Sequence, residues 1–400
     1  MQLYRKWSFY NPVMVTSGPG EISDLPSLLL KDGGYLDKSS SKTGLLVTSK
    51  SFTERGLTAK LQKLLNEQQK ELQIEIIDDV KPNPDISAIE EYAARLQDKD
   101  LQFVIGLGGG SVMDTAKALS YLLSVNDPNF SLRAHFNGKL PLPEKPPLKM
   151  IAIPTTAGTG SEVTPFATIW DMAERKKYSL ARPDLFPFAA ILDGELTLTM
   201  SEETTVTTAL DVLSHALESV WNINASPVTV NMAGRAIEIV LSTLPALLND
   251  PNNIDYRSKM LTGSYLGGMC ISSTRTALAH SMSYPITAAL GAPHGLACAF
   301  TLPALLEFNA KGFEKSSSGD NRFEIIAGMS GCRSVKELTG KLTGLFAEVG
   351  VKDLMKKYGI NAKNLQSLVS AMYTPERAGN NLRSVEQKEM EEIFCKACKL

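Results

Sequence analysis

Two side chains that often bind metal ions, Asp211 and His215, lie four residues apart in the segment from Ala209 to Val220. Nothing in this segment breaks a helix, and its apolar residues recur at helical spacing, which predicts a buried or half-buried helix. Residues four apart on a helix share one face, with roughly 5–6 Å between their Cβ atoms, so this carboxylate and imidazole could bind one divalent ion. An Asp/His pair that only stabilises a solvent-exposed helix would have the same spacing.

The positions of two further histidines favour the metal interpretation. His280 and His294 lie in segments of short residues with little charge nearby, where a histidine needed only for solvation is not expected. With Asp211 and His215 they make one carboxylate and three imidazoles. This set suits Fe(II) or Zn(II) and leaves a coordination position open for a substrate. The alternative is that the spacing is a coincidence.

Composition and charge predict an ordinary globular protein. The 400 residues suggest two domains, and the hydrophobic content of 43% and charged content of 21% are typical of a soluble chain. A net charge of -2 gives no reason to expect nucleic acid or a membrane surface as partner. No apolar run reaches membrane-spanning length, no secretory signal is seen, and the five cysteines are an odd number. We therefore expect a cytoplasmic protein without a disulfide framework.

The order of predicted elements indicates an α/β half followed by a helical half. Strands are predicted at 45–48, 73–77, 103–107, 150–153 and 189–192, alternating with helices at 58–69, 86–96 and 112–123. Such alternation is typical of a parallel sheet covered on both faces. Later segments, at 210–220, 233–248 and 336–349, show helical periodicity without strands. We place the boundary near Asp193, giving an α/β domain at 1–193 and an all-α domain at 194–400.

A glycine-rich loop, Gly108-Gly109-Gly110-Ser111, follows one predicted strand and opens a helix. Glycines let the backbone approach a ligand closely, and the N–H groups at a helix start favour a phosphate. The loop is not the G-x-G-x-x-G fingerprint, so a simple tight turn is the alternative. Asp114, near the start of the helix, could bond a ribose or nicotinamide or only favour the helix dipole.

A second loop of small polar residues, 154–164, follows the strand predicted at 150–153. Its hydroxyl and backbone N–H groups could wrap a diphosphate from the other side. Two such loops at the ends of neighbouring strands favour a dinucleotide over a mononucleotide. Two unrelated turns are the alternative.

Four segments together resemble the iron-containing (group III) alcohol dehydrogenases. They are GGGSVMDTAKALS, IPTTAGTGSEVTPFATIWD, ALDVLSHALESVWN and ALAHSMSYPITAALGAPHGLA. The resemblance covers nearly the whole chain and weakens beyond about Glu307. It implies a Rossmann-like α/β N-terminal domain and an all-α C-terminal domain, a plan shared with dehydroquinate synthase and glycerol dehydrogenase. It also implies an active site in the cleft between them.

The resemblance also implies roles for individual residues. The family's metal ligands fall on Asp211, His215, His280 and His294. The residues expected at an NADH or NADPH cofactor are Ser49, Asn83, Gly108, Gly109, Gly110, Ser111, Asp114, Thr155, Thr156, Thr159, Thr168 and Lys177. Lys177 matches a lysine that reaches the cofactor ribose, although it could instead be a solvated member of the basic run 175–177.

Two positions depart from the family pattern. Many members have a proton-relay histidine four residues after the ligand that matches His280, whereas this chain has Tyr284. A phenol has a much higher reference pKa than an imidazole, about 10. Tyr284 could still donate a proton, or it could only line the pocket. NAD-preferring members often carry an aspartate where this chain has Ser49 followed by Lys50. Without that carboxylate a 2′-phosphate is not repelled, so NADPH is plausible beside NADH.

The expected reaction is hydride transfer between a nicotinamide and a carbonyl polarised by the metal. Arg275, five residues before His280, could bind an anionic head group or form a salt bridge within the helical domain. The segments TSKSFTERG, VTPFATIWD and SSTRTALAHSMSYP resemble the phosphonate-metabolism branch of the family. That likeness implies reduction of phosphonoacetaldehyde to 2-hydroxyethylphosphonate.

Three alternatives stay open at this point. Another small anionic aldehyde or ketone, such as maleylacetate or a semialdehyde, would need the same chemistry. A lyase of the dehydroquinate synthase type would return the nicotinamide unchanged. A metal-binding protein without enzymatic activity would need no dinucleotide. The family resemblance further suggests a homodimer or larger homo-oligomer.

Overall fold

The computed structural model describes residues 6–30, 43–68, 72–174, 176–311 and 321–399. The chain folds into two compact units. The α/β unit comprises Asn11–Thr156 and Ser161–Thr197, and the helical unit comprises Met1–Tyr10, Ala157–Gly160 and Leu198–Leu400. The predicted fold class, a parallel α/β domain followed by a helical domain, is confirmed.

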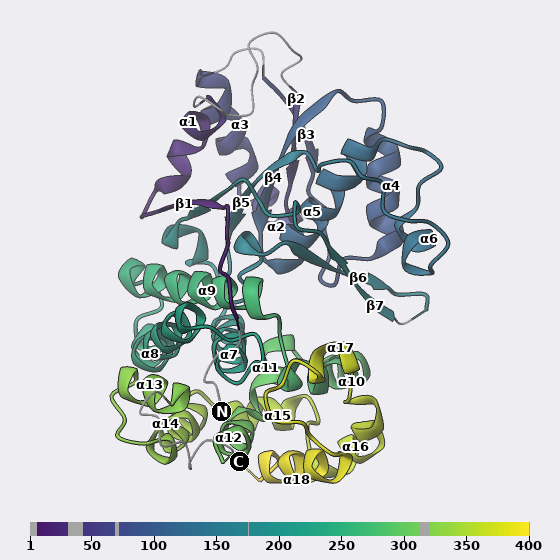
Figure 1. The fold of residues 1–400 in the computed structure, drawn as a ribbon. Helices are drawn as coiled ribbons and strands as arrows, with labels where there is room; N and C mark the ends of the chain where they lie inside the picture. Colours follow the sequence, from purple (N-terminus) through teal and green to yellow (C-terminus); the bar gives the residue numbers. More distant parts are fainter. Residues whose placement is uncertain (1–5, 31–42, 69–71, 175, 312–320, 400) are drawn as a thin grey trace. The chain divides into compact units, whose positions relative to one another are not determined.

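A six-stranded parallel sheet forms the centre of the α/β unit, with the strand order β1-β8-β5-β4-β2-β3 (Figure 1). Its strands are β1 (Met14–Ser17), β2 (Thr43–Val47), β3 (Gln73–Ile77), β4 (Leu101–Gly108), β5 (Lys149–Pro154) and β8 (Ala189–Leu192). A separate antiparallel pair consists of β6 (Phe166–Asp171) and β7 (Lys176–Ala181). The chain order reverses between β2 and β4, which is where open α/β sheets bind ligands beyond the carboxyl ends of their strands.

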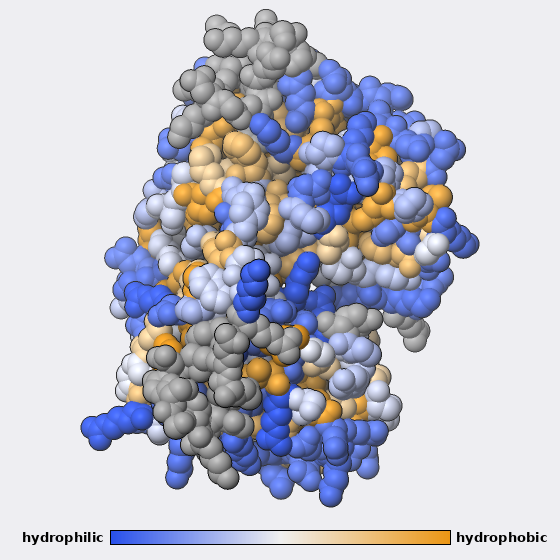
Figure 2. Space-filling model, in the orientation of Figure 1, coloured by the Kyte–Doolittle hydropathy of each residue, from blue (hydrophilic) through white to orange (hydrophobic). Residues whose placement is uncertain are grey.

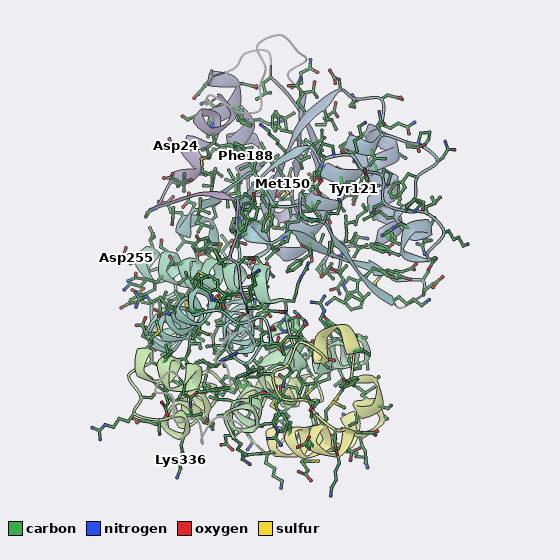
Figure 3. All side chains as sticks on the ribbon, in the orientation of Figure 1. Asp24, Tyr121, Met150, Phe188, Asp255 and Lys336 are labelled. Carbon is green, nitrogen blue, oxygen red and sulfur yellow. The ribbon has the colours of Figure 1, made fainter. Side chains whose placement is uncertain are left out.

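Alternating side chains of the sheet build two separate cores. Leu45 and Val47 pack into one hydrophobic cluster with residues of α4 (Ile86–Leu96) and α5 (Gly110–Val125). Leu46, between them, packs into the other cluster with residues of α1 (Leu25–Leu30) and α3 (Leu57–Gln68). Successive side chains on a strand point to opposite faces, so a strand buried on both faces reads as a continuous apolar run. Figure 3 shows Tyr121 and Met150 inside this unit and Asp24 at its surface.

The helices of the α/β unit connect successive strands of the sheet. They are α1 (Leu25–Leu30), α2 (Lys50–Glu54), α3 (Leu57–Gln68), α4 (Ile86–Leu96), α5 (Gly110–Val125) and α6 (Leu132–Phe136). Three of them, α3, α4 and α5, are the helices that the sequence predicted.

The helical unit is built around α7 (Glu202–Val220), which packs against α8, α9 and α11. Its other helices are α8 (Pro227–Asn249), α9 (Ile254–Thr274), α10 (Leu278–Leu290), α11 (His294–Ala299), α12 (Leu302–Ala310), α13 (Arg322–Met329), α14 (Val335–Glu348), α15 (Val351–Lys357), α16 (Ala362–Leu365), α17 (Pro375–Ala378) and α18 (Gln387–Ala397). Serine side chains fix the starts of α7 and α8: Ser201 accepts from the Thr204 N–H and Ser226 from the Thr229 N–H.

Several elements were not predicted from the sequence. The short strand β1 and the pair β6/β7 lack a long apolar run, and α9 is rich in Gly, Ser and Thr, which favour turns over helices in isolation. Helix α10 contains Pro285, which normally ends a helix. Packing within the unit overrides these local preferences.

The outer faces of both units are mainly polar. Figure 2 shows hydrophilic side chains over much of the visible face of each unit, with smaller apolar areas between them. Asp255 and Lys336 are among the exposed charges of the helical unit (Figure 3). Among the described residues, every helix is too short or too polar to cross a lipid bilayer.

Candidate functional site

Helix α7 supplies Asp211 and His215 from its buried face. Both residues are 4% exposed, and His215 Nε2 lies 3.6 Å from Asp211 Oδ1. This distance is long for a hydrogen bond. It agrees with the separation of about 3.3–3.8 Å expected between two ligand atoms of one ion when each bond is about 2.0–2.3 Å. The helix expected from the sequence is present, and its two potential ligands face the same point.

His280, on α10, brings a second imidazole to the same carboxylate. Its Nε2 lies 3.8 Å from Asp211 Oδ1, and its ring stacks on that of His215 with centroids 5.0 Å apart. The opposite nitrogen, Nδ1, lies 2.6 Å from Glu218 Oε2. A proton held between Nδ1 and this carboxylate leaves the lone pair of Nε2 on the side of Asp211, which is the tautomer that a metal requires.

Glu218, which fixes His280, is a functional residue that the sequence reasoning missed. It is fully buried and also accepts the backbone N–H groups of Ala277 and His280. Burial raises the pKa of Glu218 to about 7, and the bonds from those two N–H groups oppose the rise. A signal was present in the sequence, because Glu218 follows Asp211 by seven residues and His215 by three, so all three share one helix face.

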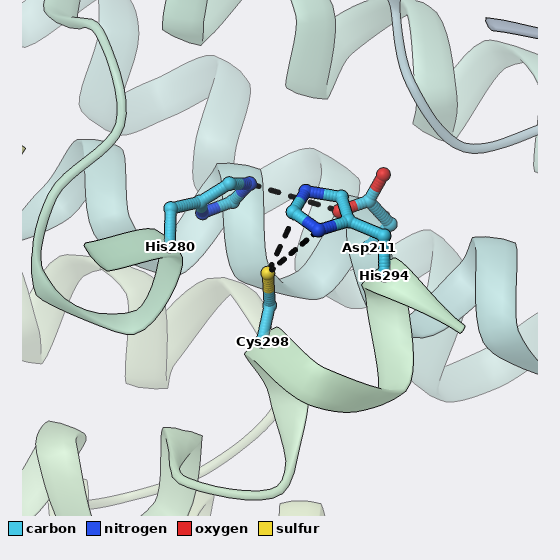
Figure 4. Close-up of side chains that lie close together, drawn as sticks. All are labelled: Asp211, His280, His294 and Cys298. Carbon is cyan, nitrogen blue, oxygen red and sulfur yellow. Dashed lines mark hydrogen bonds and ion pairs between the residues drawn. The ribbon is translucent and has the colours of Figure 1, made fainter. Parts of the chain in front are cut away.

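Helix α11 completes the group with His294 and an unexpected thiol, Cys298. Ligand atoms of Asp211, His280, His294 and Cys298 all lie within 4.8 Å of one another (Figure 4). His215 stands beside this group through its contacts with Asp211 and His280. The four residues predicted as ligands are therefore brought together from three helices, and the structure adds Cys298 to them.

Gly295 allows α11 to approach α7 closely enough for this convergence. A Cβ at this position would lie 1.9 Å from the backbone oxygen of Thr207 and 3.0 Å from the Cβ of Asp211. Both atoms belong to the α7 segment and cannot move aside as the end of a long side chain could. Only glycine permits the contact, and His294 immediately precedes it.

Two arginines lie near one another at the ends of α9 and α17. Burial lowers the pKa of Arg275, and the positive charge of Arg377 lowers it further. The backbone of Arg275 has φ 65 and ψ 174, a conformation that normally belongs to glycine. Arg377 Nη1 donates a 2.9 Å hydrogen bond to Thr276 Oγ1. Two positive charges therefore lie in one region of the structure, and the backbone of Arg275 is strained.

Tyr284 interacts with Arg377 and with the metal-ligand group. Its ring stacks parallel to that of His294, with centroids 6.4 Å apart. Burial raises the pKa of Tyr284 to about 12, and the Arg377 charge and the Thr276 hydroxyl oppose that rise. The phenol therefore stays protonated throughout the neutral pH range, which suits a neutral hydrogen-bond donor better than an acid that ionises during turnover.

In the α/β unit, the loop after β4 has the shape of a phosphate cradle. Gly109 is the N-cap of α5, and a Cβ on it would lie 3.2 Å from the side chain of Thr156. The Thr155 N–H donates to Gly108 O, which joins the two predicted loops at neighbouring strand ends. Ser111 Oγ accepts the N–H of Asn83 at 3.2 Å. Six of the residues expected at the cofactor are thus brought to one place: Asn83, Gly108, Gly109, Ser111, Thr155 and Thr156.

Asp114 and Thr168 are joined inside the same unit. The Asp114 carboxylate accepts hydrogen bonds from Ser161 Oγ at 2.7 Å and from the Thr168 N–H at 2.8 Å. The fully buried ammonium of Lys117 donates to Ser161 and Thr164. Asp114 therefore connects α5 to the second loop and to β6 through hydrogen bonds within the protein.

The remaining residues expected at the cofactor lie at other positions. Ser49 is the N-cap of α2 and shares a 3.1 Å hydrogen bond with Ser51. Lys177, on β7, lies with its Nζ 5.6 Å from the ring centroid of Trp170, while Arg175 of the same basic run lies outside the described residues. Thr159 belongs to the short segment that folds with the helical unit.

The features above define a class of protein. A buried carboxylate–imidazole group suits a divalent cation, and a parallel α/β unit with two small-residue loops at its strand ends suits a dinucleotide. Together they are typical of a metal-dependent, nicotinamide-linked oxidoreductase. Residues 12–194 match the family model of iron-containing alcohol dehydrogenases, and residues 205–398 match that of the C-terminal domain of the same family. The chain belongs to this family, as an iron-type NAD(P)-dependent alcohol dehydrogenase or aldehyde reductase.

Individual relatives differ in their substrates. The probable alcohol dehydrogenase EutG of Escherichia coli K12 is 34% identical over 77% of this chain and 75% of its own length. The phosphonoacetaldehyde reductase of Streptomyces viridochromogenes is 33% identical over 58% of this chain and 59% of its own. The sulfoacetaldehyde reductase of Bifidobacterium kashiwanohense, solved with NAD+, is 27% identical with a TM-score of 0.86, covering 98% of this chain and 99% of that one. Identities this similar do not distinguish the phosphonate branch from the others.

Proposed function

We propose that this chain uses NADH or NADPH to reduce a small aldehyde with an anionic head group to the primary alcohol. The favoured reaction is the conversion of phosphonoacetaldehyde to 2-hydroxyethylphosphonate. The observation that carries the proposal is the placement of Arg275 and Arg377 in the same unit as the metal-ligand group, with Tyr284 influenced by Arg377 and stacked on His294. The names of two relatives, a phosphonoacetaldehyde reductase and a sulfoacetaldehyde reductase, agree with such a head group.

A bound anion would stabilise the two neighbouring positive charges of Arg275 and Arg377. Two guanidinium groups repel each other, and Arg275 also loses hydration through burial. Its backbone conformation costs additional free energy in any residue but glycine. Such costs are retained where a side chain has a function, and a forked guanidinium suits the oxygens of a phosphonate, sulfonate or carboxylate.

We infer a short substrate from the neighbours of Tyr284. The charge of Arg377 influences Tyr284, and the ring of Tyr284 stacks on that of His294. We therefore favour an aldehyde whose carbonyl carbon is two bonds from its anionic phosphorus or sulfur over a long-chain aldehyde.

We assign the metal to Asp211, His280 and His294, with His215 as the further ligand expected from the family resemblance. A bound divalent ion would polarise the carbonyl, and the nicotinamide would supply the hydride. Glu218 holds the proton on His280 Nδ1, and Tyr284 remains a neutral hydroxyl because of its high pKa. The proton taken up by the product then comes from solvent.

We assign the cofactor to the loops that contain Gly108–Ser111 and Thr155–Thr159. Support comes from the position of these loops beside the reversal of strand order and from the Asn83–Ser111 hydrogen bond. The roles of Ser49, Asp114, Thr168 and Lys177 stay predictions. We also propose the domain boundary near Asp193, which is supported by family models that end at residue 194 and begin at residue 205.

The test compares anionic and neutral aldehydes in wild type and in Arg275→Gly. Glycine accepts φ 65 without strain, so this substitution removes the guanidinium while sparing the backbone. Loss of one charged hydrogen-bonding group predicts a roughly 10–100-fold rise in KM for phosphonoacetaldehyde and little change for acetaldehyde. NAD(P)H oxidation at 340 nm, roughly the nicotinamide absorbance maximum, gives both values.

Two outcomes would count against the proposal. Equal effects of Arg275→Gly on both aldehydes, together with a lower melting temperature, would show that the arginine is structural. A wild-type enzyme that prefers acetaldehyde to both phosphonoacetaldehyde and sulfoacetaldehyde would exclude an anionic substrate. A preference for sulfoacetaldehyde would keep the anionic class and replace the favoured head group.

A further inference from the structure

Arg275 stands in a strained turn that follows the end of α9. Its φ of 65 and ψ of 174 fall in a backbone region that only glycine adopts without cost. The Arg275 N–H still donates to Ile271 O at 2.9 Å, as in the last turn of a helix. The helix therefore fixes the backbone only up to this N–H group, and the conformation beyond it depends on contacts with other segments.

Two asparagine side chains from other segments hold successive carbonyl groups of this turn. Asn222 Nδ2 donates to Arg275 O at 3.2 Å, and Asn380 Nδ2 donates to Thr276 O at 2.8 Å. Asn222 follows α7 and Asn380 follows α17, so both amides reach the turn from outside α9. Because hydrogen bonds to a carbonyl are directional, the two amides fix how the peptide groups of the turn are oriented.

Further hydrogen bonds connect the turn to the support of the metal-ligand group. Thr274 Oγ1 also donates to Arg275 O, at 3.0 Å. Beyond the turn, the Ala277 N–H donates to Glu218 Oε2 at 2.9 Å, and the same carboxylate oxygen lies 2.6 Å from His280 Nδ1. The backbone that carries Arg275 is therefore anchored to the residue that orients a metal ligand.

The second arginine contacts the same turn. Arg377 Nη1 donates to Thr276 Oγ1 at 2.9 Å, while Asn380, three residues later in the chain, holds the carbonyl of the same threonine. Two bonds from one short segment thus meet at Thr276, which directly follows Arg275. The placement of the two arginines relative to each other therefore depends on the conformation of the turn.

We propose that Asn222 and Asn380 are positioning residues that set the preference for anionic aldehydes. They hold the turn in its strained conformation and so place the two arginines for a phosphonate, sulfonate or carboxylate group. The inference rests on the proposed function and adds the residues that keep its anion-binding arginines in place. Without either amide, the turn relaxes to negative φ and the guanidinium of Arg275 moves.

A double-mutant cycle with Arg275→Gly tests whether the amides act through this arginine. In the wild-type background, Asn222→Ala and Asn380→Ala should each raise KM for phosphonoacetaldehyde by about 3–10-fold, the effect of one hydrogen bond. KM for acetaldehyde and both kcat values should not change. In the Arg275→Gly background neither alanine should raise KM further, since the guanidinium is absent and glycine accepts φ 65 unaided.

Asn231→Ala is the matched control for the kinetic cycle. The Asn231 amide also donates to a backbone carbonyl of the helical unit, Pro227 O, but within α8. It should leave KM for both aldehydes unchanged. Asn380 is half-buried whereas Asn222 is fully buried, so Asn380→Ala decides the question if Asn222→Ala does not fold.

Crystal structures of the two alanine variants give a readout that needs no substrate. The φ of Arg275 should become negative in them. A φ that stays near 65 in both variants, or KM effects that add in the double variants, would overturn the inference and leave the proposed function intact. If wild type and Arg275→Gly treat both aldehydes alike, the proposed function itself fails, and the role of the amides in specificity fails with it.

Discussion

The two units differ in the way they prepare a ligand site. In the helical unit, side chains from α7, α10 and α11 converge on one point and are mostly buried. In the α/β unit, the expected contacts are backbone N–H groups and small hydroxyls that follow β4 and β5. The first kind of site depends on the identity of each side chain, whereas the second is distributed over a loop. A single substitution should therefore abolish the first and only weaken the second.

The largest effect is expected from His280→Ala. Removing this imidazole takes away a ligand and leaves Glu218 buried without its partner, so the ion should be lost and kcat should fall by about 1,000-fold or more. Metal analysis and NAD(P)H oxidation measure the two losses. His135→Ala is the matched control, since His135 lies on α6 of the other unit, with Nδ1 2.9 Å from Leu140 O. Full metal occupancy in His280→Ala would show that the ligand assignment is wrong.

A smaller effect is expected from Glu218→Gln. The amide can still accept from His280 Nδ1 but carries no negative charge, so the imidazole becomes a weaker ligand. Residues that support a metal-bound histidine typically contribute 10–100-fold in metal affinity or activity, and we expect a loss of about that size in a chelator competition assay. Unchanged affinity would mean that Glu218 is needed only for packing.

Gly109→Ala should weaken the cofactor site by about tenfold while leaving the metal content unchanged. The new methyl group would lie 3.2 Å from the side chain of Thr156, on the backbone that is expected to approach the diphosphate. Fluorescence titration with NADH and NADPH measures the change. Gly344→Ala is the control, because a Cβ there meets nothing within 4 Å. An unaltered Kd in Gly109→Ala would move the cofactor away from this loop.

The smallest effect on activity is expected from Glu162→Gln, which should change stability instead. Burial raises the pKa of Glu162 to about 7 from its ordinary value of 4.5. The folded state therefore keeps this proton to a higher pH than the unfolded chain, so the stability it contributes at low pH is lost between about pH 4.5 and 7. Glutamine removes the titration.

Urea unfolding at pH 5, 6, 7 and 8 compares the Glu162→Gln variant with wild type. As the pH rises from 5 to 8, the unfolding free energy of the variant should increase by about 3 kcal/mol relative to that of wild type, since each pKa unit corresponds to about 1.36 kcal/mol. A difference that stays constant with pH would show that Glu162 titrates normally.

The same contrast explains what the sequence could predict. The strands, the helices between them and the glycine-rich loop are local patterns, and the Asp211/His215 pair is local to one helix, so all were predicted. His280 and His294 were found because histidine is rare in this chain. The fold class followed from the alternation of elements.

Residues that depend on contacts between distant segments were not predicted. Glu218 acts through His280, 62 residues later in the chain. Arg377 reaches Thr276, 101 residues earlier, from the region where the family resemblance weakens. Cys298 joins the group of possible ligand atoms only because α11 packs against α7, which depends on Gly295. Such roles follow from packing rather than from sequence spacing.

We propose that three helices of one unit bind a single divalent cation and that hydride transfer requires this ion. The most direct measurement is metal content together with turnover, in wild type stripped with a chelator and then titrated with Zn(II) or Fe(II). We expect aldehyde reduction to be absent in the stripped protein and to rise in proportion to the added metal, up to one ion per chain. Full NAD(P)H-dependent reduction by a chain that contains no metal would contradict it.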